Sequence, residues 1–138
     1  MHRTSQIRRS SFRTLTAFCL LALSTAAIAV VVTLPIHIST PSSVSGGSSF
    51  TTTVDTEAAS SQPGSVKVST TRPDILTSPT GSWPYILTVP ANSSTASFTV
   101  TASSVSSSQA AKMVTCKTTE DISNPNNWRA TCDLTVNP

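Results

Sequence analysis

Residues 89–101, with the sequence Val-Pro-Ala-Asn-Ser-Ser-Thr-Ala-Ser-Phe-Thr-Val-Thr, decide the fold class. In their second half the apolar side chains of Ala96, Phe98 and Val100 alternate with hydroxyl side chains. Alternation with a period of two is typical of a strand with one face in a core and the other in water. Before it, Pro90-Ala91-Asn92 predicts a tight turn from a preceding strand. The chain therefore needs further strands to cover this apolar face.

The composition of the remaining chain also favours strands. The 138 residues suffice for one domain and a targeting segment, and only 11% of them are charged. Counted from Val30 onward, 40 of 109 residues are Ser or Thr. Such a composition, interspersed with Val, suits a pleated surface better than a helix. We therefore expect an all-β domain.

The positive formal charge of +3 is concentrated at the N-terminus. Four arginines precede the first apolar run, whereas from Val30 onward five basic residues face six acidic ones, 5 − 6 = −1. A nearly neutral domain has no broad positive field to hold a phosphate backbone. We therefore expect no nucleic acid partner.

The N-terminal segment has the pattern of an export signal. Residues 1–13 are polar and basic, residues 15–23 are apolar, and Ala27-Ile28-Ala29 offers a small-x-small cleavage site. This predicts a signal peptide over residues 1–29. The alternative is an uncleaved anchor over about residues 15–34, which is an uncharged run long enough to cross a bilayer. Both interpretations place the C-terminal part outside the cytoplasm, either secreted or at the cell surface.

Short apolar alternations recur along the rest of the chain. With turn signals between them, they predict seven or eight antiparallel strands packed as a β-sandwich over residues 34–138. The expected strands span residues 33–39, 49–57, 65–70, 75–76, 83–89, 95–101, 112–117 and 129–136. Residues 102–111, which are rich in Ser, are expected to form a surface connection.

Several of these segments resemble the immunoglobulin-like modules of bacterial secreted and cell-surface proteins. The resemblance lies in Val89 to Val105, in the closing strand that ends Leu134-Thr-Val-Asn-Pro138, and in the earlier segments 41–47 and 68–76. It covers about residues 34–138 and implies an immunoglobulin-like sandwich. Such modules serve as spacers, stalks and binding units, so the resemblance says little about function. The connection from Thr118 to Trp128 is longer than the family pattern.

Two cysteines flank that connection. Cys116 and Cys132 both point inward if Cys116 shares a face with Val114 and Cys132 with Leu134. In an exported domain such a pair predicts a disulfide that closes the final hairpin. The alternative is two buried thiols that act as small core residues.

Three aromatic residues are the candidate binding residues. Trp83, Tyr85 and Trp128 could form a platform for a carbohydrate or a peptide, or they could fill the core as large aromatics usually do. The acids and amides of residues 120–127 lack the regular spacing of a calcium loop, and His37 has no ligand neighbours in sequence. We therefore expect no metal site and no cofactor.

Catalytic residues are not evident in the sequence. No base stands near the many hydroxyls, and no pair of carboxylates is spaced for acid–base chemistry. We expect a non-enzymatic, structural or adhesive module whose partner is a protein or glycan at the cell surface. A carbohydrate- or peptide-binding module that uses the three aromatics is the alternative. A membrane contact is expected only through the N-terminal segment if it is uncleaved.

Overall fold

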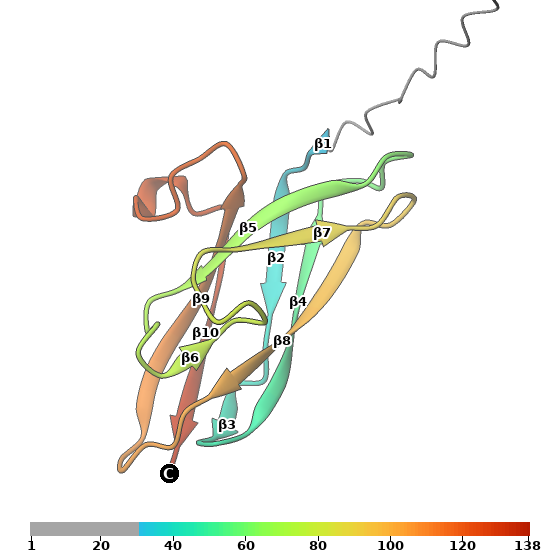
Figure 1. The fold of residues 1–138 in the computed structure, drawn as a ribbon. Helices are drawn as coiled ribbons and strands as arrows, with labels where there is room; N and C mark the ends of the chain where they lie inside the picture. The colour runs from blue at the N-terminus through green and yellow to red at the C-terminus, as the bar shows by residue number, and fades with distance from the viewer. Residues whose placement is uncertain (1–30) are drawn as a thin grey trace, which may run out of the picture.

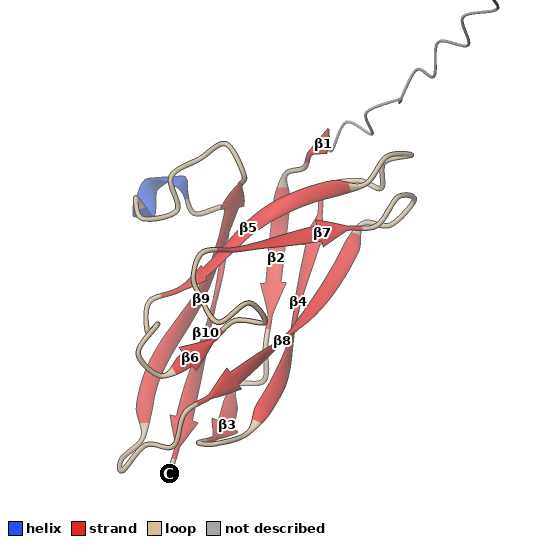
Figure 2. Cartoon of the chain, in the orientation of Figure 1, coloured by secondary structure: helices blue, strands red, loops and turns tan. Residues whose placement is uncertain are grey.

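The computed structural model of the chain describes residues 31–138 (Figures 1 and 2). The predicted signal peptide, residues 1–29, lies outside these residues, as does most of the alternative anchor. Within residues 31–138 no helix is long and apolar enough to cross a membrane.

Ten strands and one 3₁₀ turn form the described part of the chain (Figure 2). They are β1 (Val31–Val32), β2 (Pro35–Ser39), β3 (Ser43–Ser45), β4 (Ser49–Thr56), β5 (Gly64–Thr70), β6 (Leu76–Thr77), β7 (Tyr85–Val89), β8 (Thr95–Ala102), β9 (Gln109–Lys117), η1 (Pro125–Asn127) and β10 (Ala130–Asn137). The prediction of an all-β domain is confirmed.

The strands form two sheets (Figure 1). The six-stranded sheet has the order β1-β5-β9-β10-β3, with β7 also paired to β5, and the four-stranded sheet has the order β2-β4-β8-β6. Two pairings, β1 with β5 and β3 with β10, are parallel. The expectation that all strands pair antiparallel is therefore wrong for these two pairs. The N-terminal strands contribute to both sheets, because β2 pairs with β4 and β3 with β10.

The stretch that decides the fold class forms β7, a turn and β8. Asn92 has a φ of 60° in that turn, a left-handed conformation that Asn tolerates better than most residues. β8 pairs with β4 so that Val100 lies opposite Phe50 and Ala96 opposite Val54. The apolar residues of both strands therefore share the inner face, as the alternation predicts.

The main core lies between the two sheets and takes residues from both. Its fully buried members include Val54 and Val100 of the four-stranded sheet and Val66, Met113 and Val136 of the six-stranded sheet. A smaller second cluster contains Val114, Cys116 and Ile122, with Trp128 packed against it. Apolar contact therefore continues beyond the sandwich interior on one sheet.

The second cluster corrects the predicted disulfide. Cys132 lies opposite Met113 in the register of β9 and β10, so it faces the main core, whereas Cys116 lies on the other face of β9. Both cysteines are free. All four residues from Met113 to Cys116 are buried, because the connection between β9 and β10 covers the outer face of β9. A strand buried on both faces has no polar alternation from which its inward face can be predicted.

Candidate binding cleft

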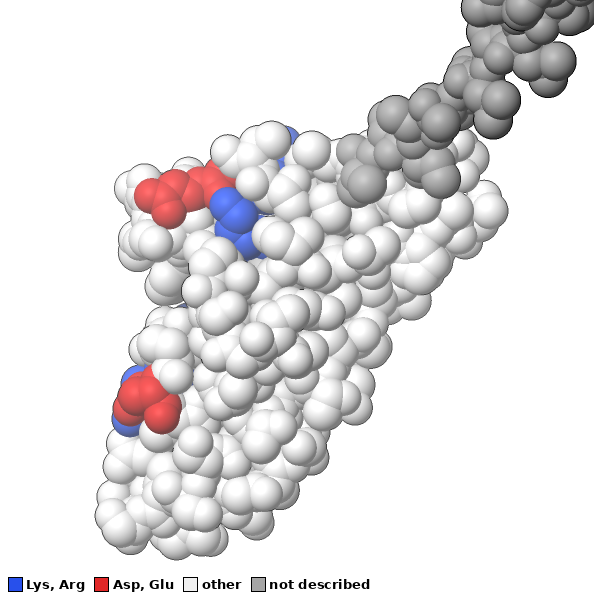
Figure 3. Space-filling view, in the orientation of Figure 1, with Lys and Arg blue, Asp and Glu red and all other residues white. Residues whose placement is uncertain are grey.

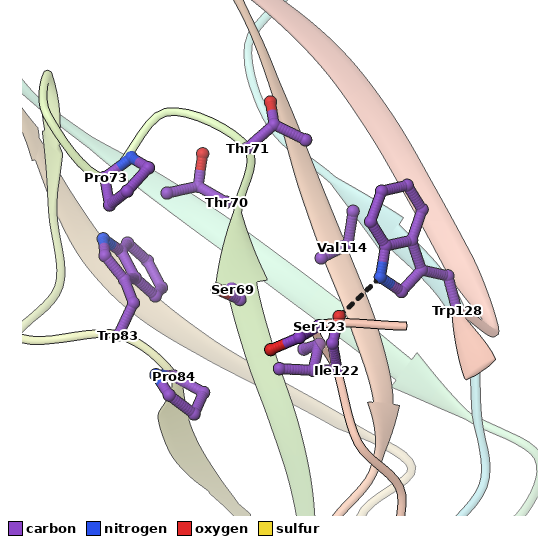
Figure 4. A pocket seen from close by; sticks show the side chains of 10 residues that line it. All are labelled: Ser69, Thr70, Thr71, Pro73, Trp83, Pro84, Val114, Ile122, Ser123 and Trp128. Carbon is purple, nitrogen blue, oxygen red and sulfur yellow. Dashed lines mark hydrogen bonds between the residues drawn. The ribbon is translucent and has the colours of Figure 1, made fainter. Parts of the chain in front are cut away.

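A cleft of about 330 Å³ lies on the outer face of the six-stranded sheet (Figure 4). Its floor is formed by β5 and β9, and its walls by the segment around Pro73, the end of the connection between β6 and β7, and the connection between β9 and β10. The lining residues are Ser69, Thr70, Thr71, Pro73, Trp83, Pro84, Val114, Ile122, Ser123 and Trp128. Figure 4 shows Trp83 and Trp128 on opposite sides of the cleft, with Ser69 and Thr70 between them.

The Trp83 wall is held by the main core. Trp83 packs against that core, and its Nε1–H donates to the carbonyl oxygen of Leu76 at 2.7 Å. The loop before it is closed by Ser78, whose hydroxyl donates to the Ser82 carbonyl oxygen at 2.5 Å and accepts from the Ser82 N–H at 3.1 Å. The Trp83 indole is therefore held both by its hydrogen bond to Leu76 and by its packing against the main core.

Pro73 extends the same wall and is positioned by the residues beside it. The Thr70 hydroxyl accepts a hydrogen bond from the Arg72 N–H at 3.1 Å and donates to the Lys112 carbonyl oxygen at 3.0 Å. The Arg72 guanidinium contacts both carboxylate oxygens of Asp74, at 2.9 and 2.7 Å, and the pKa of Asp74 is lowered chiefly by these hydrogen bonds. The hydrogen bond from Thr70 to Lys112 therefore ties the start of the segment that carries Pro73 to β9.

The Trp128 wall is built on the second cluster. Trp128 packs against Ile122 and its neighbours in that cluster, and its Nε1–H donates to the Ile122 carbonyl oxygen at 2.7 Å (Figure 4). The η1 turn before it is capped by Asn124, whose side chain accepts from the Asn126 N–H at 3.1 Å. Both indole N–H groups of the cleft therefore donate to backbone carbonyl oxygens of the protein.

Glu120 fastens the base of the connection that carries Trp128. Its carboxylate accepts from the Lys117 N–H at 3.0 Å and forms a two-point ion pair with the guanidinium of Arg129. The Lys67 ammonium donates to the Glu120 carbonyl oxygen at 2.6 Å. The hydrogen bonds from Arg129 are the main reason that the pKa of Glu120 falls from 4.5 to about 2. Glu120 is therefore ionised under ordinary conditions and joins both ends of the connection.

The cleft itself carries no formal charge. None of its ten lining residues ionises. Among the basic residues nearby, Arg72 pairs with Asp74, Arg129 pairs with Glu120, and Lys67 donates to the Glu120 carbonyl oxygen. Figure 3 shows that charged side chains on the face in view gather in a few small groups. The hydroxyls of Ser69 and Ser123 have no hydrogen-bond partner among residues 31–138, so they are free for a ligand.

Of the three predicted aromatics, the structure brings two together. Trp83 and Trp128 share the cleft, whereas Tyr85 packs on the inner face of β7 against the main core. Its ring centroid is 5.1 Å from that of Phe98. Sequence reasoning missed Pro73 and Ile122, which line the cleft, and the residues around them carry no signal of a binding site.

The remaining candidates form contacts of their own. His37 is exposed on β2 and lies 3.0 Å from the Asp55 carboxylate. A hydrogen bond from His37 is the main reason that the pKa of Asp55 is lowered. Burial raises the pKa of both the Cys116 and the Cys132 thiols. Asp121 accepts a hydrogen bond from the Ser123 N–H at 3.0 Å. Within the described range, 31–138, no three His, Cys, Asp or Glu side chains gather as a metal site would need.

Comparisons with known proteins add a structural likeness. No family model matches the sequence, and no curated protein matches it significantly. Among solved structures, the chain is similar to the CARDB domain of a Pyrococcus furiosus protein, crystallised in complex with di-metal ions. The match covers 78% of this chain and 93% of that one, at 16% identity and a TM-score of 0.41. A likeness at this level carries no inference about function.

Proposed function

We propose that this chain is an exported, non-catalytic immunoglobulin-like module that acts in adhesion, and that the cleft between Trp83 and Trp128 is its contact with a partner. The observation that carries the proposal is that two tryptophans from separate connections line one cleft. Large aromatic side chains supply much of the contact energy in binding sites, and concave sites with a few polar groups are where ligands bind. The partner is a glycan or a protein at the cell surface.

The order of the strands supports an immunoglobulin-like module. A constant-type immunoglobulin domain has one sheet of four strands, ABED, and one of three, CFG. The orders β2-β4-β8-β6 and β5-β9-β10 correspond to these two sheets. The strands β1, β3 and β7 extend the second sheet. β6 precedes β7 along the chain, which departs from the usual sequence of strands.

Two observations support a non-catalytic role outside the cytoplasm. The thiols of Cys116 and Cys132 have raised pKa values, so neither is a ready nucleophile, and His37 does not line the cleft. Export rests on the signal pattern of residues 1–29. If that signal is uncleaved, the part of residues 15–34 that precedes β1 holds the module at the membrane, because Val31 and Val32 pair with β5.

Adhesion of coated beads tests the proposal. Beads carrying the exported protein are expected to adhere to glycan- or protein-coated surfaces, and the double variant Trp83→Ala/Trp128→Ala is expected to lose that adhesion. Ile86→Ala, at a half-exposed position outside the cleft, is the control and should adhere normally. Equal adhesion by the double variant would remove the cleft from the proposal. Protease digestion of a C-terminal tag on intact cells tests the compartment separately.

A further inference from the structure

We infer that the occupant of the cleft is a neutral saccharide, bound with one or two sugar rings between Trp83 and Trp128; this inference rests on the proposed function. The cleft volume of about 330 Å³ lies near the lower end of the range of roughly 300–1,000 Å³ for ligand sites. A short segment of a glycan chain fits such a volume, and the open cleft leaves the rest of that chain in solvent.

The charge of the lining argues for a neutral ligand. A phosphate, sulfate or uronic acid placed here would lose water without gaining a counter-ion, because no lining residue ionises. The nearest guanidinium groups are also occupied: Arg72 is held by Asp74 and by the side-chain oxygen of Gln109, and Arg129 by Glu120. The Lys67 ammonium, on the same face of β5 as Ser69, does not line the cleft and donates to the Glu120 carbonyl oxygen at 2.6 Å. An anionic ligand that used either guanidinium would have to break one of these ion pairs.

The donors of the cleft argue against a peptide. Each residue of a docked peptide brings a carbonyl oxygen that needs a donor once it leaves water. Both indole N–H groups already donate to backbone carbonyl oxygens, Trp83 to Leu76 and Trp128 to Ile122, and no Asn, Gln, Lys or Arg side chain lines the cleft. The side chains therefore offer only hydroxyls.

These same features suit a sugar ring. A pyranose has apolar C–H faces that pack against an indole, and the indole needs no free N–H for that contact. Its hydroxyls are donors and acceptors at once, as are the free hydroxyls of Ser69 on the floor and Ser123 on the wall. A sugar ring in the cleft would pack a C–H face on an indole while hydroxyls meet its rim.

Titration of the full-length protein with defined probes tests the inference. The neutral probes are cellohexaose, xylohexaose, laminarihexaose, maltohexaose and chitohexaose; the other probes are oligogalacturonate and a proline-rich decapeptide. At least one neutral probe is expected to change the tryptophan fluorescence saturably. Trp128→Ala and Trp83→Ala are each expected to weaken that binding at least about tenfold, as for a buried anchor residue. Tyr85→Phe, on the inner face of β7, is the control and should bind normally.

A second variant guards against misfolding of the tryptophan variants. The Ser69 hydroxyl has no partner among the described residues, so Ser69→Ala should leave the melting temperature unchanged while weakening saccharide binding several-fold. Binding of only the oligogalacturonate or the peptide, with both tryptophans required, would overturn the saccharide inference and leave the proposed cleft intact. If no probe binds and bead adhesion is also insensitive to the tryptophans, both the inference and the proposed function fail.

Discussion

Thr52 is a core residue whose buried hydroxyl has no hydrogen-bond partner among the residues that the structure describes. It is fully buried on β4, and its hydroxyl is the one buried side-chain group within residues 31–138 that lacks a partner. Thr115 is equally buried, but its hydroxyl donates to the Lys67 carbonyl oxygen at 2.9 Å. Two threonines of the same burial therefore differ only in whether the hydroxyl is satisfied.

This contrast predicts opposite effects of the same substitution. Thr52→Val keeps the side-chain shape and removes an unsatisfied hydroxyl, so the free energy of unfolding should rise by about 1 kcal/mol. Thr115→Val removes a made hydrogen bond and should lower it by about 1 kcal/mol. Urea denaturation measures both. A loss of stability in Thr52→Val would show that its hydroxyl has a partner in solution.

Glu120 gives the chain a pH-dependent contact. Its pKa in the folded protein is about 2, below the ordinary value of 4.5, because of the Arg129 guanidinium. A carboxyl with a lowered pKa stabilises the fold above its unfolded pKa, and that stabilisation is lost as the pH falls through the folded pKa. The difference in stability between the natural protein and Glu120→Gln should therefore shrink as the pH falls from above 4.5 to about 2.

Thermal unfolding across this pH range, with hydrogen exchange at residues 118–128, measures that difference. Asp133→Asn is the matched control, because Asp133 pairs with Lys112 in a mostly exposed bridge outside the cleft. Exposed pairs contribute little, so Asp133→Asn should change the melting temperature less than Glu120→Gln does. A constant difference for Glu120→Gln would mean that its ion pair does not act in solution.

The connection between β9 and β10 forms one wall of the cleft on the outer face of the six-stranded sheet. It carries Trp128 and Ile122, and it covers Cys116 on the outer face of β9. Its apolar cluster is separate from the main core. It can therefore open locally while the sandwich stays folded.

The thiol of Cys116 reports on that opening. Ile122→Ala should weaken the second cluster by about 2 kcal/mol and raise the open population about thirtyfold. Alkylation of Cys116 by iodoacetamide, followed by peptide mass spectrometry, should accelerate accordingly, while alkylation of Cys132 should not change. Equal acceleration at both thiols would indicate global rather than local unfolding. Slow alkylation of both under native conditions and complete alkylation in denaturant without reductant would confirm that they are free.

At the scale of the whole molecule, one core joins both sheets. Met113 lies at its centre on β9, fully buried, and faces residues of the four-stranded sheet. Met113→Ala should lower the free energy of unfolding by about 3 kcal/mol, since it leaves a cavity where the two sheets meet. Circular dichroism and tryptophan fluorescence should report one coincident transition in urea. Ile86→Ala, at a half-exposed position, should stay within about 0.5 kcal/mol of the parent.

The sequence by itself determined the strands that have one buried and one solvent-exposed face. In β4, β8 and the second half of β10, apolar side chains alternate with hydroxyl or polar ones, and this local pattern follows directly from the pleat of a strand. It also predicted Trp83 and Trp128 as candidates. It did not predict β1 or β3, which are two or three residues long and pair in parallel with distant strands.

Only the tertiary structure decided which face of β9 is inner and which tryptophans meet. Val114 and Cys116 are apolar because a connection covers them, whereas Met113 and Thr115 face the core, so the strand offers no alternation. The pairing of Cys132 with Met113 separates the two thiols, and β5 and β9 place Trp83 and Trp128 across one cleft. The register between strands, and whether a connection covers the outer face of a strand, depend on contacts between distant segments. Local periodicity carries no information about them.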